Sequence, residues 1–536
     1  MRVSIVKGRL LLDVTDKVIA LTSELSYDEY KGISAAEFFY RNREIAGFSN
    51  PTRALYQTVR ELVENALDAT ELYGVRPSIK LEISLDSSDP SVVTVKVEDN
   101  GIGIPKEEVP FVFGRVFYGS KYTLKQSRGV FGLGIKMAVL YAQITTGKPI
   151  YIKSSTPSAK DIYEYELLID INKNIPVILN EKVYKKRGNW HGTIVSLTIE
   201  GNWSNAKKRI EEYIKRTALI APYAEISLKA PDLEVHFPRS TKALPTPPKE
   251  GKPHPYGVDL EMLKSLIARN DGNTTIKEFL LRTFDGVGRN TVLQFLSWAG
   301  IKENIPLKKL TVEELEILAR KMRDFPNWRR PRSITLSPLG EELLIEGVRK
   351  ILNPEFVAAI SRKPSSYSGH PFIVEVAIAF GGGVPVVDRP LLYRFANKIP
   401  LLYDEGVDVS RKVVDNIDWS YYKVKMPAPL AVIVHICSTK MPFKGVGKEA
   451  IAEVPEIEKE VENAVKEVAR RLRRHISKME KLFETVRRRV EIEKYIPEVA
   501  RALSEITKLD QRVFERKLKR MLRKKVLTLK EEGVVS

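Results

Sequence analysis

Residues 60–70 (RELVENALDAT) contain side chains whose types and spacing could do chemistry on a phosphate. In a helix, Glu61, Asn65 and Asp68 stand at i, i+4 and i+7, so they share one face. That face is polar inside an otherwise apolar pattern, and burying it is costly without a purpose. A carboxylate one turn from a carboxamide can align a water molecule beside a metal-bound phosphate. Glu64 is a rival carboxylate, and a solvent-facing helix edge would explain the motif if it stood alone.

A second segment, EDNGIGIP at 98–105, follows a strand-like alternation of apolar and polar residues. Asp99 ends that strand, and the chain then turns through Gly101 and Gly103. A carboxylate in this position can accept a hydrogen bond from an exocyclic amine, and the glycines let a flat ring approach the backbone. The pattern is weak by itself, because many turns have the same composition.

Two further segments follow. In GVFGLGIKMAVLYA (129–142), glycines precede an apolar helical run from about Ile135, and Lys136 adds a positive charge. A glycine-rich loop that enters a helix N-terminus presents free N–H groups, which suit phosphate. The spacing matches neither the Walker loop nor the Rossmann pattern. The fourth segment, HGT, contributes Gly192 and Thr193 between strand-like stretches and is very weak alone.

The elements that must position these residues can be read from periodicity. Apolar residues at helical spacing predict a helix over 53–70, and alternating patterns predict strands over 79–85 and 92–98. Short β-branched runs predict buried strands at 372–380 and 430–437. Between these regions, a proline-rich stretch predicts an extended linker, and the stretch after it contains short helices. After Pro455 the pattern is helical and basic, typical of a solvated helix face or an interaction tail, with direct DNA contact as the alternative.

Composition excludes several classes of protein. The chain has 536 residues, and Lys+Arg exceed Asp+Glu by 87 to 68, a net charge of +19 that suits an acidic polymer as a partner. The single cysteine, Cys437, excludes a disulfide framework and a cysteine-ligated metal cluster, and the six histidines are scattered. No signal peptide is evident, and the longest apolar run, 428–437, is about half the length that spans a bilayer. We expect a soluble intracellular protein.

The order and spacing of the four segments are more specific than any one of them. ExxxNAxDA, DxGxG, GxxGxGxK and GT in this order resemble the GHKL ATPase family, which includes gyrase B-type topoisomerases, MutL repair proteins, heat-shock chaperones and histidine kinases. The resemblance implies an ATP site on a helix-on-sheet sandwich. By this resemblance, Glu61 would be the general base and Asn65 would bind Mg²⁺ through its side-chain oxygen. Asp99 would accept from the adenine amine with Thr193 nearby, and Gly103 would let a lid flex.

The resemblance also implies a lid at 106–131 that includes Ser120 and Lys121. The remaining ATP-binding residues would cradle the phosphates: Gly129, Val130, Phe131, Gly132, Leu133, Gly134, Ile135 and Lys136.

Within this family, the inserted helical region resembles the helix-two-turn-helix domain of the B subunits of type IIB topoisomerases (the topoisomerase VI family). Segments such as GFSNPTRALYQTVRELVENALDAT, FGRVFYGSKY, KPHPYGVD, RKPSSYSGHPFIVE, FANKIPLLYDEG and CSTKMPFKGVGKEAIAEV resemble those proteins along nearly the whole chain. Histidine kinases fit poorly because no phosphoacceptor helix precedes the ATPase, and the Toprim segment of a gyrase B chain is missing. A MutL-like repair clamp and a heat-shock-type chaperone are the alternatives, and neither explains the inserted helices.

The fold implied is α+β and multidomain: a GHKL (Bergerat) ATP-binding sandwich, a helix-two-turn-helix insert, and an α/β transducer domain with a long C-terminal helix. The expected parts are an N-terminal extension (1–33), the ATPase domain (34–237), a Pro-rich linker (238–256), the helix-two-turn-helix domain (257–328), the transducer (329–455), and a basic helical stalk and tail (456–536).

The function implied is an ATP-gated clamp that relaxes and decatenates DNA. Lys448 in KGVGKE matches the lysine that reaches the γ-phosphate from the transducer, and Lys440 and Lys444 are near rivals. The implied partners are double-stranded DNA, a second copy of this chain when ATP is bound, and the tyrosine-bearing A subunit in an A2B2 heterotetramer. The implied location is cytoplasmic, with the nucleoid and without a membrane. The stretch 284–291 (FDGVGRNT) resembles a helix-hairpin-helix turn that could meet a DNA phosphate, or is a plain turn.

Overall fold

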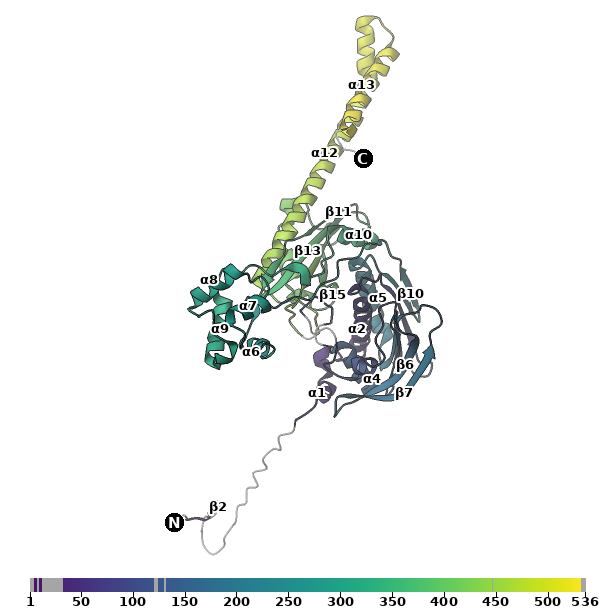
Figure 1. Cartoon of the computed structure of the whole chain (residues 1–536). Helices are drawn as coiled ribbons and strands as arrows, with labels where there is room; N and C mark the ends of the chain where they lie inside the picture. Colours follow the sequence, from purple (N-terminus) through teal and green to yellow (C-terminus); the bar gives the residue numbers. More distant parts are fainter. Residues whose placement is uncertain are drawn as a thin grey trace.

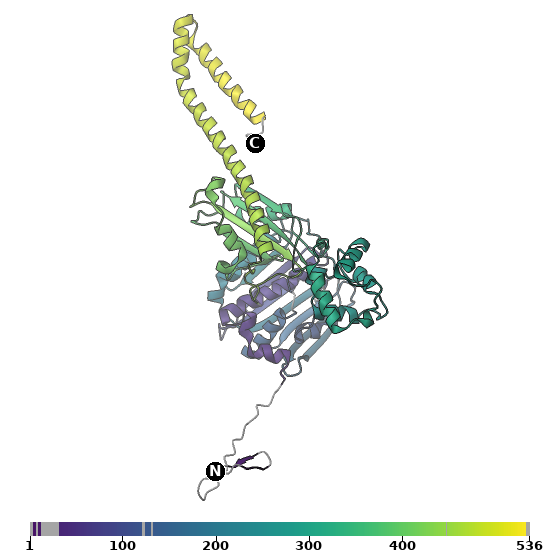
Figure 2. The ribbon, with the colours of Figure 1, turned by 90° about the vertical axis from the view of Figure 1, so that its left-hand side faces the viewer.

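The computed structural model describes residues 4–6, 9–11, 32–119, 124–129, 132–445 and 447–531. Two layered α/β units lie against each other, a cluster of short helices projects from one flank, and a long helical arm leaves the second unit (Figures 1 and 2). We call the first unit, which carries the four sequence segments, the ATPase-like unit, and the second the transducer-like unit.

The ATPase-like unit is built on a mixed sheet with the strand order β10-β9-β3-β4-β8-β5-β6-β7. Helices α2, α4 and α5 cover one face of this sheet (Figure 2). The strands predicted at 79–85 and 92–98 are confirmed as β3 and β4, which pair antiparallel. The strands are β3 (Ser78–Leu85), β4 (Val92–Asp99), β5 (Ile150–Ser155), β6 (Asp161–Asp170), β7 (Ile175–Lys185), β8 (Gly192–Glu200), β9 (Glu225–Ala230) and β10 (Leu233–Phe237). The helices are α1 (Ala35–Arg41), α2 (Pro51–Glu71), α3 (Val109–Gly114), α4 (Gly134–Thr145) and α5 (Trp203–Ile220).

Helix α2 confirms the helix predicted at 53–70. It starts at a proline in the first turn, and the side chain of Asn50 caps it by accepting from the Arg53 N–H at 2.9 Å. Nearly all of its residues are buried, on the polar side as well as the apolar side. The alternative interpretation of this motif as a solvent-facing helix edge is therefore wrong. One side of α2 packs on the sheet, and the other faces the transducer-like unit.

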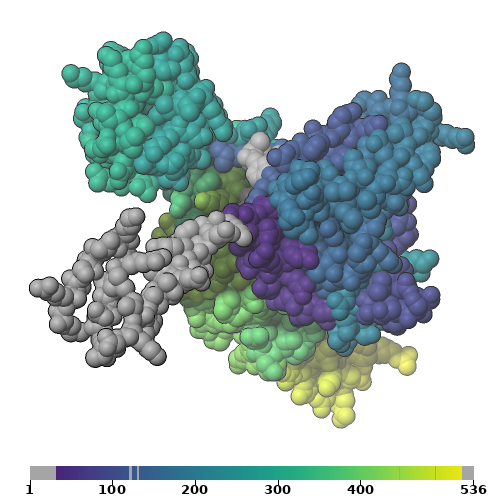
Figure 3. Space-filling model, turned by 90° about the horizontal axis from the view of Figure 1, so that it is seen from below, coloured from purple at the N-terminus to yellow at the C-terminus, as the bar shows by residue number. Residues whose placement is uncertain are grey.

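The helical cluster forms a separate lobe beside the ATPase-like unit (Figure 3). Aromatic side chains fill a core of its own, with Phe295, Phe325 and Trp328 in mutual contact. The extended stretch that leads into it is not a loose tether, because Lys249 N–H bonds to Ile334 O and Gly251 N–H bonds to Leu124 O. The cluster comprises α6 (Leu260–Ala268), α7 (Ile276–Thr283), α8 (Arg289–Ala299) and α9 (Val312–Asp324).

The transducer-like unit has a second mixed sheet, with the order β11-β13-β16-β14-β15 and β12 paired to β13. The runs predicted to be buried strands are confirmed as β13 and β16, and both are buried on both faces. One face packs on α11 and the start of α12, and the other on α10. The elements are α10 (Glu341–Leu352), β11 (Phe356–Ser361), β12 (Ser365–Tyr367), β13 (His370–Phe380), β14 (Leu391–Ala396), β15 (Ile399–Pro400), α11 (Val409–Asp415) and β16 (Leu430–Ser438).

The predicted C-terminal helical region is an arm made of α12 (Pro455–Thr507) and α13 (Gln511–Glu531), which folds back beside it (Figure 2). Large apolar side chains such as Phe483, Tyr495 and Ile506 are exposed along it. At the other end, β1 (Ser4–Val6) pairs with β2 (Arg9–Leu11). Among the helices that the structure describes, none is both long and apolar enough to cross a membrane.

One hydrophobic core runs without interruption through both units. It includes residues of α2 and α5 as well as residues of α10 and the transducer sheet. Helices α5 and α10 meet at Gly347, where an added Cβ would lie 1.8 Å from the backbone oxygen of Leu219. The two units therefore meet through direct helix–helix contact, so a change in one is transmitted to the other by packing.

We predict that Gly347→Ala lowers the free energy of unfolding by about 1–3 kcal/mol, because the methyl group forces α5 and α10 apart. The measurement is thermal unfolding of the purified chain. Gly406→Ala is the control, since nothing lies within 4 Å of its added Cβ and its φ is not positive. Equal unfolding temperatures for the two variants would show that this contact does not join the units.

Candidate functional site

Glu61 and the glycine-rich segment meet, as their order in the sequence predicts. The Glu61 side chain is buried, and its Oε1 accepts a hydrogen bond from Gln57 Nε2 at 3.2 Å. A Cβ added to Gly134, the first residue of α4, would lie 1.6 Å from Glu61 Oε2. Glycine is therefore required here because the carboxylate lies directly against the N-terminal end of α4. That end carries free N–H groups and a positive dipole, which favour a phosphate.

The rival carboxylates on α2 are held in ion pairs. Glu64 Oε1 lies 2.7 Å from Arg60 Nε, and Asp68 Oδ1 lies 3.0 Å from Arg128 Nη1. All four side chains are buried. Asn65, between them on the helix, is only half-buried. The geometry therefore distinguishes Glu61, which faces the start of α4, from Glu64, which is committed to an arginine.

Asp99 and Thr193 are neighbours across the sheet, since β4 and β8 place them directly opposite each other. Gly101 N–H donates to Asp99 Oδ1 at 2.8 Å. Burial raises the pKa of the Asp99 carboxyl to about 7, although backbone N–H groups of Gly101 and Thr193 act in the opposite direction. Ser154 on β5, which the sequence analysis missed, lies 3.1 Å from Thr193 Oγ1 and accepts from Ile104 N–H. Its only signal in the sequence is a pair of serines at a strand end.

Gly103 is fixed by close packing. Its φ is +66°, and an added Cβ would lie 2.1 Å from the backbone oxygen of Ser155. Gly192 is constrained in the same way, with φ +127° and 2.0 Å to Asp99 O. These contacts bring β5, β8 and the turn after β4 together. The expected part of Gly103 in lid flexing stays a prediction.

The glycine-rich segment leads into α4 as predicted. Leu133 is the N-cap residue, and Gly132 has a φ of +59°. Ile135 is buried, and Lys136 Nζ donates to the backbone oxygen of Tyr118 at 2.8 Å. This contact ties the first turn of α4 to Tyr118, a residue within the expected lid (106–131). The backbone oxygen of Gly129 accepts a hydrogen bond from Ser127 Oγ. Four of the predicted site residues lie outside the described residues: Ser120, Lys121, Val130 and Phe131.

Lys448 reaches this place from the transducer-like unit. Its side chain is buried, its Nζ donates to Arg128 O at 3.0 Å, and it lies 3.9 Å from Glu64 Oε2. The rivals Lys440 and Lys444 are exposed. Of the three lysines, Lys448 is the one whose ammonium group lies against the segment directly before the glycine-rich stretch.

Arg60 holds the loop that carries Lys448, and the sequence analysis did not single it out. It is fully buried, and it donates to Gly447 O at 3.0 Å and to Lys448 O at 3.3 Å. It also lies 2.9 Å from Glu449 Oε1. The residue before Glu61 thus binds a loop almost 390 positions away in the chain. No local sequence pattern could reveal that contact.

Glu375, His435 and Cys437 form a buried group that could in principle hold a metal ion. Their polar atoms are already engaged: His435 Nδ1 lies 2.8 Å from Glu375 Oε2, and His435 Nε2 accepts from Lys398 N–H at 3.0 Å. Glu375 also accepts from two backbone N–H groups before α10. Burial raises the pKa of the Cys437 thiol well above its ordinary value. We therefore interpret this group as a hydrogen-bonded brace rather than a metal centre.

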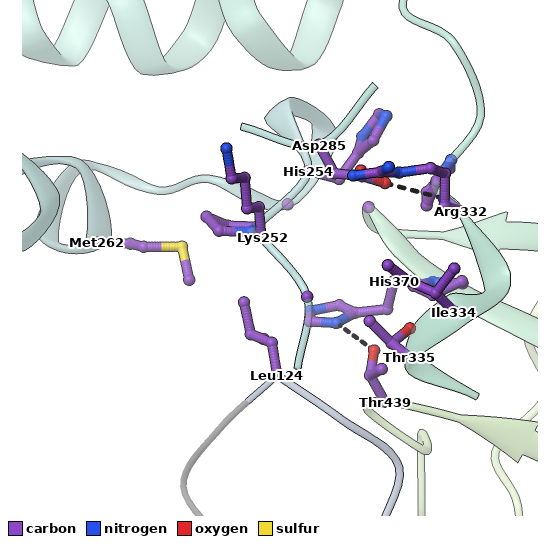
Figure 4. Close-up of a pocket in the computed structure, with 16 residues that line it drawn as sticks. Leu124, Lys252, His254, Met262, Asp285, Arg332, Ile334, Thr335, His370 and Thr439 are labelled. Carbon is purple, nitrogen blue, oxygen red and sulfur yellow. Dashed lines mark hydrogen bonds and ion pairs between the residues drawn. The ribbon is translucent and has the colours of Figure 1, made fainter. Parts of the chain in front are cut away.

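A cavity lies where the linker and α6 meet the transducer-like unit (Figure 4). Asp285 pairs with Arg332 at 2.6 Å on one side, and His370 Nδ1 lies 3.1 Å from Thr439 Oγ1 on the other. None of the candidate ATP-binding residues that the structure describes lines it. It is the seam that docks the helical cluster, separate from the candidate site.

We predict that Asp99→Asn stabilises the nucleotide-free chain in a pH-dependent way. Because the folded-state pKa is raised from 3.8 to about 7, the unfolded chain loses this proton first. The stabilisation of the folded wild type by protonated Asp99 is therefore fully present below pH 4. It is lost progressively up to about pH 7, at about 1.4 kcal/mol of unfolding free energy per pH unit. The gain in unfolding temperature of Asp99→Asn should grow from pH 4.5 to 7.5 and then level off. A constant difference across this range would mean that Asp99 is not perturbed.

Comparisons with known proteins agree with this geometry. Residues 331–489 match the family model described as topoisomerase VI B subunit, transducer, and residues 50–167 match that of histidine kinase-, DNA gyrase B- and HSP90-like ATPases. Among solved structures, the ATPase region of Saccharomyces cerevisiae topoisomerase II covers 84% of this chain and 99% of that chain, at 12% identity and a TM-score of 0.40, a likeness too low to carry a conclusion.

Two relatives are much closer and match along nearly their whole length. The B subunit of type 2 DNA topoisomerase 6 from Pyrobaculum aerophilum is 55% identical over 503 residues, which are 94% of this chain and 95% of that protein. The protein of the same name from Saccharolobus islandicus is 49% identical over 470 residues, 87% of this chain and 89% of that protein. The resemblance inferred from the four segments and the helical insert is thereby confirmed over the MutL-like and chaperone alternatives. This chain belongs to the family of type 2 DNA topoisomerase 6 B subunits.

Proposed function

We propose that this chain is the ATP-binding and ATP-hydrolysing subunit of a type IIB topoisomerase, and that nucleotide-driven pairing of two copies gates the passage of one DNA duplex through another. The observation that carries the proposal is that Glu61 lies against the N-terminus of α4, while Lys448 from the other unit bonds to Arg128 O in the segment that leads toward this helix. The relatives' name supports DNA as the substrate and a second subunit as the partner.

The nucleotide would extend from Asp99 and Thr193 on the sheet to the glycine-rich segment at the start of α4. The adenine amine donates to Asp99 beside Thr193, and the phosphates accept from the N–H groups of 129–136 at the start of α4. Asn65 offers a carboxamide oxygen one helical turn from Glu61, the kind of donor that Mg²⁺ prefers. Bound there, Mg²⁺ would neutralise charge on the phosphates. Ser120, Lys121, Val130 and Phe131 would complete the lid and the loop.

Glu61 acts in this proposal as the general base. Its carboxylate is held by Gln57 and lies against α4, so it can take a proton from a water molecule that attacks the γ-phosphate. Lys448 places a positive charge from the other unit at the same phosphate, so its position reports whether the γ-phosphate is present. Hydrolysis then removes the group that holds the two units in one orientation.

Strand passage follows from assembly. Two copies pair when ATP is bound, and the arm of α12 and α13, with its exposed apolar side chains, docks on the A subunit that cuts DNA, giving an A2B2 heterotetramer. The net charge of +19 suits contact with DNA and work at the nucleoid. The segment 284–291, which contains the turn after α7 and the first residues of α8, adds a DNA contact through the N-terminus of α8, where no side chain caps the helix; its Asp285 is paired with Arg332.

We predict that Glu61→Gln lowers ATP turnover by about 10²–10⁴-fold and leaves nucleotide binding within a few-fold, since only the proton acceptor is lost. The measurement combines steady-state hydrolysis with binding of a non-hydrolysable analogue. Glu64→Gln is the comparison, because it weakens an ion pair without touching the start of α4. Wild-type turnover in Glu61→Gln would show that Glu61 is not the base.

We predict that Lys448→Ala reduces relaxation of supercoiled plasmid by the complex with the A subunit by about 10²-fold, more than it reduces nucleotide affinity. Lys444→Ala is the matched comparison, because that lysine is exposed and pairs only loosely with Glu453 at 3.7 Å. If Lys448→Ala relaxes DNA normally and Lys444→Ala does not, Lys444 is the lysine that senses the phosphate.

A further inference from the structure

A two-residue turn of the transducer-like unit also reaches into the ATPase-like unit. Asn397 and Lys398 join β14 to β15, whose nearest pair is Ala396 with Ile399. Both turn residues have positive φ, 50° and 65°. Asparagine suits such a turn, but the second position favours glycine, and lysine there is strained. A strained non-glycine residue held in place by its surroundings is a reason to ask what its side chain does.

The Lys398 side chain ends in a buried ion pair with the last residue of α2. Its Nζ lies 2.9 Å from Glu71 Oε2 and 3.2 Å from Ser337 Oγ. Glu71 in turn accepts from Arg128 Nη2 at 2.8 Å through its other oxygen. Arg128 also pairs with Asp68. A chain of contacts thus runs from the transducer turn, through the end of α2, to the residue that precedes Gly129.

The four charged groups lie together, with Asp68 and Glu71 opposite Arg128 and Lys398 and every side chain at most 5% exposed. Burial alone would raise the pKa of the Glu71 carboxyl, yet Arg128 and Lys398 hold it below its ordinary value. Two negative and two positive charges balance. Removal of any one member leaves a buried charge without compensation, which is far more costly than removal of a balanced pair.

The side chain of Asn397, the other residue of this turn, bonds to the backbone of the segment that contains Arg128. Asn397 Nδ2 donates to Ser127 O at 3.3 Å and to Ser438 O at 2.9 Å. On the other side, Ser337 N–H donates to Gln126 Oε1 at 2.7 Å. Residues 126–128 are therefore bonded to the transducer-like unit along their length, directly before the phosphate loop.

We propose that Lys398 is a positioning residue that couples the phosphate loop to the transducer, separately from Lys448. It contacts Glu71 and Ser337 and acts on the loop through Arg128. When the loop moves on binding or losing a phosphate, Arg128 and Glu71 carry that movement to the turn between β14 and β15. Lys448 touches the same segment at Arg128 O, so two transducer lysines hold it at different points. This inference rests on the proposed function and adds to it a residue needed for coupling rather than for hydrolysis.

The test is Lys398→Gly in the complex with the A subunit, because glycine relieves the strained turn while removing the charge. The readouts are ATP hydrolysed and supercoils removed in the same reaction, together with nucleotide affinity. We expect relaxation per ATP to fall at least about tenfold, nucleotide affinity to change less than about threefold, and Lys398→Arg to recover much of the coupling. Equal fractional losses of hydrolysis and relaxation, or no loss of either, would overturn the positioning role.

Lys423→Gly is the matched control for hydrolysis and thermal unfolding. Lys423 is also a transducer lysine with a φ of 65°, but its ion pair with Glu480 is exposed. We expect both quantities to stay near the wild type in this variant. Wild-type complex that neither hydrolyses ATP nor relaxes DNA would overturn the proposed function and this inference together. Proportional loss in Lys398→Gly alone would overturn only the inference.

A double-variant cycle separates coupling from stability. Glu71→Gln and Lys398→Met each leave one unbalanced buried charge, whereas the double variant restores the balance. The double variant should therefore unfold at a higher temperature than either single variant and yet remain as poorly coupled as they are. Recovery of coupling along with stability would mean that the ion pair is only structural, and additive unfolding temperatures would mean that the two side chains do not interact.

Discussion

A fully buried arginine is the constraint on which the joint between the two units depends. Arg60 cannot give up its proton, so its burial requires carboxylates and carbonyl groups placed around it. Glu64 comes from its own helix, and Glu449 and the backbone of 447–448 come from the other unit. Burial raises the pKa of the Glu449 carboxyl, and Arg60 opposes that rise. Separation of the units would therefore leave charges on both sides to be hydrated again.

The continuous core gives this electrostatic joint its stiffness. Helices α5 and α10 touch backbone to backbone at Gly347, so the transducer-like unit cannot slide over the ATPase-like unit without repacking. Residues 126–128 and the Lys448 loop meet where this core borders the phosphate loop. Movement there is constrained on one side by packing and on the other by ion pairs, which favours a few discrete arrangements over continuous bending.

The sequence predicted those parts of the fold and site that depend on local pattern. The helix at 53–70, the strand that ends at Asp99 and the entry into α4 all follow from periodicity and glycine spacing. Arg60 and Lys398 escaped notice, because their partners in the other unit are hundreds of residues away and an isolated Arg or Lys has no period. The glycines were recognised, but the close contacts that require them, such as Gly134 against Glu61, become visible only in three dimensions.

The two transducer lysines that reach the ATPase-like unit share a backbone property. Lys398 and Lys448 both have positive φ, at 65° and 54°, and both are buried, Lys398 against Glu71 and Lys448 against Arg128. A left-handed residue in a short turn aims its side chain along one direction with little freedom, but it costs strain that buried contacts must offset. Such a lysine is held firmly only while its partner is in place. For the coupling proposed above, strained lysines on turns are therefore better suited than relaxed lysines on helices.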